Sequence, residues 1–111
     1  MGKQKNRKTK ANDKLSVVLG VAWYRKEQWS RLLEISRDRD QLEDTYEAWE
    51  ANAKASLPKL RKRDVIPRRV DIDVEELLRW CRSERRPVDG SARAVFTAEK
   101  LREQIETKKT S

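Results

Sequence analysis

The longest apolar run in the chain, SVVLGVAWY, spans residues 16–24 and is rich in β-branched side chains. A short, nearly continuous run of this kind favours a buried β-strand. Because side chains alternate between the two faces of a strand, the run separates into a bulky face and a smaller face. The bulky face holds Val17, Leu19, Val21 and Trp23, and the smaller face holds Val18, Gly20, Ala22 and Tyr24. We expect the bulky face to meet the main core and the smaller face to allow close approach by another element.

Helical spacing replaces this alternation from residue 26 onward. The pattern predicts a helix over residues 26–36, with an apolar stripe of Trp29, Leu32, Leu33 and Ser36. A second helix is predicted over residues 41–62, with Asp40 and Glu43 forming a capping box at its start. Its stripe consists of Leu42, Tyr46, Trp49, Ala53, Ser56 and Leu60. Pro58 lies inside this stretch, so the helix either continues with a kink or ends near Leu57.

The second half of the chain repeats the sequence of a strand followed by two helices. Residues 65–72, VIPRRVDI, predict a strand with Ile66, Val70 and Ile72 facing inward. Asp73 and Glu76 then cap a third helix over residues 74–84, whose stripe is Val74, Leu77, Leu78 and Cys81. Ser91 is predicted to cap a fourth helix, whose stripe is Ala94, Ala98, Leu101 and Ile105. The order is β-α-α-β-α-α, and the fold class is α+β: a small, mainly helical two-layer domain.

The edges of so small a sheet need an explanation, since two strands by themselves are only marginally stable. Either the helices cover both edges, or two chains pair their strands into a larger sheet. Pro67 cannot donate a hydrogen bond to a neighbouring strand, which marks residues 65–72 as an edge strand. A homodimer formed through this edge strand is therefore one of the two arrangements that the sequence predicts.

The net charge of the 111-residue chain is +8 at neutral pH, but it is unevenly distributed. Residues 1–14 hold six cations and one acid and lack an apolar period, whereas residues 15–106 carry a net charge of only +1. We therefore expect a disordered basic arm (1–14), a single α+β domain (15–106) and a polar C-terminal tail (107–111).

Clustered cations can attract nucleic acid through its phosphates without reading its sequence. The arm is one such cluster, and the segment KLRKRDVIPRR, residues 59–69, is another. Candidate phosphate-contacting residues are Lys3, Lys5, Arg7, Lys8, Lys10, Arg61, Lys62, Arg63, Arg68 and Arg69. The alternatives are a solubilising tail for the arm, and a helix C-terminus followed by a charged edge strand for residues 59–69.

The residue types present exclude several kinds of catalytic site. The chain has no histidine and one cysteine, Cys81, which excludes His-based triads, an internal disulfide and Cys-rich zinc sites. Carboxylates gather at residues 71–76, but Asp73 and Glu76 are already explained as a cap and Glu75 complements the helix dipole. We expect no enzymatic activity, no metal and no cofactor.

The apolar run that follows the arm has the length of a secretory signal core. However, it ends in Tyr24, Arg25 and Lys26 without a small-residue cleavage pattern, and it is too short to span a membrane. We expect a cytoplasmic protein without a membrane partner.

Trp80 is the aromatic residue that the helical pattern explains least, because it lies off the stripe of the third helix. One interpretation is packing against the fourth helix. The other is a partner-binding anchor formed by Trp80, Arg85 and Arg86, since Trp and Arg dominate the hot spots of protein interfaces.

Four segments, AWYRKEQW, LEDTYEAW, VDIDVEELLRWC and PVDGSARA, lie between residues 22 and 94. In pattern and order they resemble a group of small bacterial proteins of unknown function. The resemblance implies a bacterial cytoplasmic setting, and it implies no activity and no site residues.

Two functional hypotheses follow from the sequence. The first is a non-enzymatic protein–protein interaction or regulatory module that associates with itself. The second is a nucleic-acid-associated accessory protein that uses its basic arm.

Overall fold

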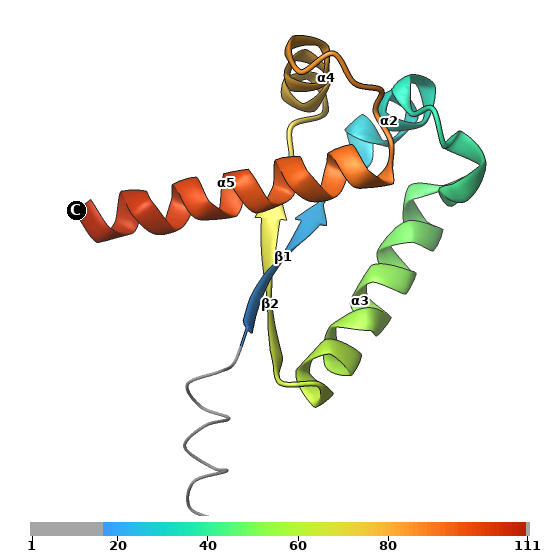
Figure 1. The fold of residues 1–111 in the computed structure, drawn as a ribbon. Helices are drawn as coiled ribbons and strands as arrows, with labels where there is room; N and C mark the ends of the chain where they lie inside the picture. Colours follow the sequence, from blue (N-terminus) through green and yellow to red (C-terminus); the bar gives the residue numbers. More distant parts are fainter. Residues whose placement is uncertain (1–16, 111) are drawn as a thin grey trace, which may run out of the picture.

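The computed structural model describes residues 17–110, with side chains described as far as residue 107. Within these residues it has a two-stranded sheet and four α-helices, with two short 3-10 helices (Figure 1). In chain order these are β1 (Val17–Trp23), η1 (Lys26–Gln28), α2 (Trp29–Ile35), η2 (Arg39–Gln41), α3 (Tyr46–Lys62), β2 (Val65–Asp71), α4 (Val74–Ser83) and α5 (Gly90–Thr110). The predicted fold class and order of elements are confirmed. α5 includes residues 107–110, which the sequence assigned to a polar tail.

The two strands pair in parallel, because α3 returns the chain to the end at which β1 begins (Figure 1). Val17 lies opposite Val65, and Trp23 lies opposite Asp71. α2 and α4 lie beyond the carboxyl ends of the strands, and α5 crosses the sheet (Figure 1). None of the helices in the described part of the chain is both long and apolar enough to cross a membrane.

The smaller face of β1, and not its bulky face, meets the main core. A side-chain carbon at Gly20 would lie 3.3 Å from atoms of Thr97 and Leu101, so the glycine allows α5 to approach the strand closely. Tyr24 is buried in the core, whereas Val17 and Leu19 on the bulky face are exposed. The close approach was predicted correctly, but the inward direction of the bulky face was wrong.

The start of α3 differs from the prediction. The helix begins at Tyr46, five residues later than predicted, and Thr45 caps it by accepting a hydrogen bond from the amide of Ala48. Asp40 lies in η2, and the backbone and side chain of Glu43 bind Trp29 and Asn52 instead of closing a capping box. α3 continues through Pro58 to Lys62, which settles the question of whether it ends at the proline.

The helix caps after β2 are both formed by aspartates. Asp73 accepts a hydrogen bond from the amide of Glu76, as the sequence predicts. At α5 the cap is Asp89, which accepts from the amide of Ala92, and Ser91 lies inside the helix. The predicted stripe of α5 is also displaced, because Ala94 and Ala98 are exposed. The buried positions of this helix are Ala92, Phe96, Thr97 and Leu101.

The core gathers side chains from β1, α2, β2, α4 and α5. Its largest fully buried members are Leu32, Ile72, Leu77, Val70, Val74 and Cys81. Trp29 and Tyr24 also belong to the core, where they meet edge-on at 5.9 Å between ring centroids, and Trp29 stacks on the partly buried Trp49 at 5.4 Å. Ile66, which was predicted to face inward, is 47% exposed.

Candidate functional site

The outer edge of β1 carries backbone groups with no strand beside them. The amide of Val17 donates a hydrogen bond to the carbonyl of Asp64, in the turn before β2. The carbonyl of Trp23 accepts a hydrogen bond from the amide of Ile72, just after β2. Because backbone groups alternate between the two edges of a strand, those of Val18, Gly20 and Ala22 point away from β2. Within the described residues these groups make no hydrogen bond. The outer edge is therefore open to an added strand.

The outer edge of β2 has a different character. The same alternation directs the backbone groups of Val65, Pro67 and Arg69 outward. Pro67 has no amide hydrogen to donate, and the side chains of Arg68 and Arg69 are exposed. A proline and charged side chains are common devices by which proteins prevent pairing at an edge strand. This edge, which the sequence predicted as the dimer contact, is therefore poorly suited to strand addition.

Exposed apolar side chains gather where β1 begins. Of the five large apolar side chains that are exposed among the described residues, four lie at this end of the sheet, and we call them the β1 patch: Val17, Val18, Leu19 and Ile66. Their exposed fractions are 57%, 40%, 44% and 47%, and Ile66 lies directly opposite Val18 in the sheet. Val18 and Ile66 share the face that α5 covers, whereas Val17 and Leu19 lie on the opposite face. The fifth, Val95, is on α5. Exposed apolar side chains on both faces of one sheet end mark a candidate site of protein interaction.

A groove of about 360 Å³ lies between β1 and α5 beside the β1 patch. Its lining residues on α5 include Ala94, Ala98, Leu101 and Ile105, which form the stripe that the sequence predicted to be buried. Within one chain only Leu101 of this stripe is buried. Small alanine side chains leave room above the edge of the strand, so the groove can accept further side chains.

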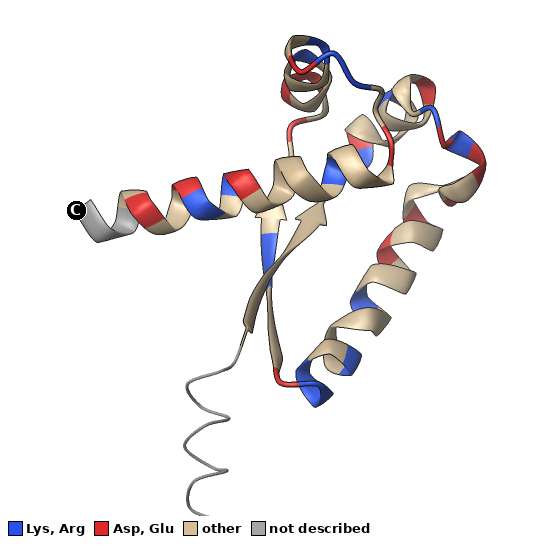
Figure 2. Cartoon of the chain, viewed as in Figure 1, with Lys and Arg blue, Asp and Glu red and all other residues tan. Residues whose placement is uncertain are grey.

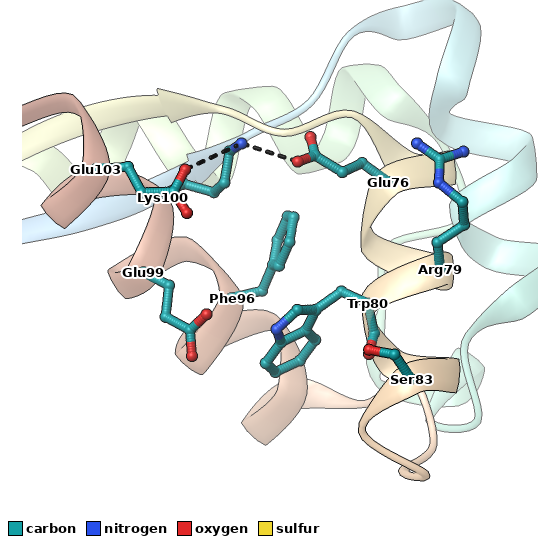
Figure 3. Close-up of a pocket in the computed structure, with 8 residues that line it drawn as sticks. All are labelled: Glu76, Arg79, Trp80, Ser83, Phe96, Glu99, Lys100 and Glu103. Carbon is teal, nitrogen blue, oxygen red and sulfur yellow. Dashed lines mark hydrogen bonds and ion pairs between the residues drawn. The ribbon is translucent and has the colours of Figure 1, made fainter. Parts of the chain in front are cut away.

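Trp80 lies in a separate pocket of about 370 Å³ between α4 and α5 (Figure 3). Its ring packs against Phe96, with 5.4 Å between the ring centroids, which confirms the packing interpretation. Lys100 donates to Glu76 at 2.9 Å above the two rings, and this hydrogen bond raises the pKa of Lys100. The charged rim of the pocket is thus already partly paired.

Arg85 and Arg86, the other two residues of the predicted anchor, have different environments. The guanidinium of Arg86 lies 5.6 Å from the ring centroid of Trp80 and donates to Ser91. Arg85 is exposed and has a left-handed backbone, with φ of 56°. The structure therefore brings Arg86 to Trp80. These contacts of Arg86 join the loop before α5 to Trp80 on α4 and Ser91 on α5, so they have a structural role within one chain.

The basic candidates within the described residues fall into two groups, one at the end of α3 and one along β2 (Figure 2). Arg61, Lys62 and Arg63 end α3 or follow it directly, and all three are exposed. Arg69 stacks its guanidinium 4.0 Å from the ring centroid of Trp23. Lys3, Lys5, Arg7, Lys8 and Lys10 lie outside the described residues.

The carboxylates of residues 71–76 have separate partners. Asp71 pairs with Arg25 at 3.6 Å, and Glu75 receives a hydrogen bond of 2.7 Å from Arg31. Glu76 binds Lys100, and Asp73 caps α4. Among the described residues, no three or more Asp, Glu, Cys or His side chains form a group that could hold a metal ion.

A largely buried ion pair joins the loop before η2 to the start of α5. Arg93 donates two hydrogen bonds to Asp38, at 2.9 and 2.6 Å, and a third to Ser36 at 3.3 Å. The exposed fractions of the Arg93 and Asp38 side chains are 12% and 21%. The bonds from Arg93 hold the pKa of the Asp38 carboxyl below its usual value. Burial raises the pKa of nearby Tyr24 to about 12 and also raises that of the Cys81 thiol.

Comparison with models of protein families, with curated proteins and with solved structures finds no match to this chain. The resemblance to small bacterial proteins stays a prediction.

The β1 patch and its groove are the features that the sequence interpretation missed. A continuous apolar run indicates burial, but it does not distinguish burial within one chain from burial by a partner. One signal was present, because small Ala94 and Ala98 share a stripe with Leu101 and Ile105. A stripe of this composition suits close approach by another backbone more than it suits a large core.

Proposed function

We propose that this protein is a non-enzymatic protein-interaction module that associates with itself by adding a strand at the outer edge of β1. The observation that carries the proposal is the coincidence of the β1 patch with unpaired outward backbone groups. Strand addition joins chains through main-chain hydrogen bonds, while neighbouring pockets receive alternate side chains. The groove beside Val18 and Leu19 can serve as such a pocket. A cytoplasmic setting, a regulatory role and a bacterial origin belong to the same proposal.

A charge placed at the patch should separate the chains. We expect Val18→Lys to raise the dissociation constant of the dimer by roughly 100-fold or more, because charged side chains on an edge strand oppose pairing. Multi-angle light scattering across a concentration series would measure the shift from dimer to monomer.

The matched control is Val95→Lys, which places the same charge at a valine of nearly equal exposure, 38% against 40%, outside the β1 patch. Val95→Lys should keep the parent mass. A parent protein that is monomeric at high micromolar concentration, or two lysine variants with the same mass, would overturn the proposal.

Nucleic-acid association is a second candidate, favoured by where the arm joins the fold. The amide of Val17 donates to Asp64, which follows the exposed cations Arg61, Lys62 and Arg63. Val17, the first described residue after the basic arm, therefore lies beside the basic end of α3. We propose that the arm and this end of α3 act as one basic surface. Together they could contact the phosphates of one nucleic-acid backbone.

Deleting residues 1–13 should strongly reduce binding to duplex DNA at low salt. The deletion removes five lysines and arginines. Each lost phosphate contact should reduce the slope of log K against log salt concentration by about 0.9 in magnitude. Fluorescence anisotropy at several salt concentrations would measure both effects. Deletion of residues 107–111, which removes Lys108 and Lys109, provides the control at the other end of the chain. Equal binding by both truncated proteins would exclude this function for the arm.

A further inference from the structure

The added strand is identified by considering which edges can pair with one another. Joining β1 of one chain to β2 of the next would leave a free edge at each end and continue as an open assembly. Pro67 and the exposed Arg68 and Arg69 disfavour that arrangement, because they stand on the edge that β2 would have to offer. Pairing of β1 with β1 uses the same surface on both chains and closes as a two-fold dimer.

We infer that β1 pairs antiparallel with β1 of a second copy around a two-fold axis at Val18, which gives a four-stranded sheet in the order β2-β1-β1-β2. This inference rests on the proposed function. Of the described β1 residues whose backbone groups point outward, Val18 is exposed, whereas Gly20 and Ala22 are partly covered. In this register the two Val18 residues exchange a pair of hydrogen bonds, and Val17 of each chain lies opposite Leu19 of the other.

The position of α5 decides between this register and one centred on Gly20. α5 lies directly over Gly20, with contacts of 3.3 Å to a side-chain carbon built there. With a two-fold axis at Gly20, the α5 helices of the two chains would lie over neighbouring strands that are only about 4.8 Å apart. The two helices would then clash, because packed helices need about 8–10 Å between their axes. An axis at Val18 separates the two Gly20 residues by four positions along the strands, or about 13 Å, and both helices then fit on the same face.

The same register covers the exposed apolar side chains of β1, whereas Ile66 on β2 lies outside the new contact. Val18 of the partner copy enters the groove beside Val18, where Ala98 and Ile105 of α5 meet it. Residues opposite one another in an antiparallel pair share a face, so Val17 and Leu19 cover each other across the axis. The dimer thereby gives a contact to Ala98 and Ile105 of the α5 stripe, which a single chain leaves without full cover.

A cysteine at the axis tests this arrangement. Residues of a hydrogen-bonded antiparallel pair have Cα atoms about 5.5 Å apart, a separation that a disulfide can bridge. Val18→Cys should therefore form a covalent dimer under mild oxidation, seen on non-reducing gels. Parent protein is the control for Cys81, which is buried and has no disulfide partner, and Val95→Cys is the control for random collision.

The possible results separate this inference from the proposed function. A monomeric parent overturns both. If Val18→Lys dissociates the dimer but the Val18→Cys dimer forms no disulfide, the register is overturned and strand addition at β1 stays in place. If reduced Val18→Cys is itself monomeric, a mixture of Val17→Cys and Leu19→Cys proteins tests the same register. A disulfide between the two variants supports the axis at Val18, and its absence in a dimeric mixture refutes it.

Discussion

Replacing Trp29 with alanine is expected to destabilise the fold by about 3–5 kcal/mol, the usual cost of removing a buried tryptophan from a core. Trp29 is buried, stacks on Trp49 and meets Tyr24 edge-on. Its indole Nε1 also donates a 3.3 Å hydrogen bond to the carbonyl of Glu43, which joins α2 to the segment before α3. The substitution therefore leaves a large cavity and an unpaired carbonyl together.

The size of the domain makes this loss decisive. Small proteins have a free energy of unfolding of about 5–15 kcal/mol, and a domain of this length belongs near the lower end. Urea unfolding followed by circular dichroism should give a lower midpoint, and thermal unfolding should shift by roughly 15 °C or more. Trp23→Ala is the matched control, because Trp23 lies outside the core cluster and is only half-buried. Equal losses for Trp29 and Trp23 would contradict the assignment of Trp29 to the core.

The sequence predicted the elements that local patterns determine. Asp73 and Glu76 are three residues apart, so the start of α4 could be found from adjacent residues alone. The start of α3 could not, although Asp40 and Glu43 have the same spacing. The carbonyl and carboxylate of Glu43 bind Trp29 and Asn52, and these tertiary contacts outweigh the local pattern.

The faces of β1 show the same division between local and distant information. Alternation correctly separated the two faces, because it depends only on neighbouring residues. The choice of the buried face depends on α5, whose Thr97 and Leu101 lie more than seventy positions along the chain from Gly20. Bulk was therefore a poor guide, since the face with the smallest residue accepts the helix.

The candidate site was only partly predictable for a related reason. The sequence predicts strand addition at residues 65–72 as one of two arrangements, because Pro67 indicates an edge strand, whereas we propose it at β1. In the parallel register the proline faces outward on β2 and removes a donor from that edge. Which edge is open follows from the register, and the register follows from the crossover through α3.

The pair of Arg93 and Asp38 should account for the second large effect on stability. Arg93→Met removes the charged partner while keeping an unbranched side chain, and it leaves Asp38 largely buried without the two hydrogen bonds from Arg93. We expect a loss of roughly 2–4 kcal/mol at pH 7, somewhat below the cost for a fully buried pair, because part of Asp38 remains in contact with water. Arg31→Met is the control, since its ion pairs with Glu34 and Glu75 are exposed and should contribute less than about 1 kcal/mol.

The pH dependence of this loss separates the ion pair from simple packing. Arg93 lowers the pKa of Asp38 in the folded state, so the contribution of the pair is fully present above the unfolded carboxyl pKa of about 3.9. The stabilisation from the pair declines as the pH falls below the unfolded pKa, and it is lost once the pH passes below the folded pKa of Asp38, because the Asp38 carboxyl is then protonated in the folded state as well. The difference between parent and Arg93→Met in urea unfolding should therefore be larger at pH 7 than at pH 3. A difference that stays constant over this range would show that Arg93 acts through its packing and not through the charge of Asp38.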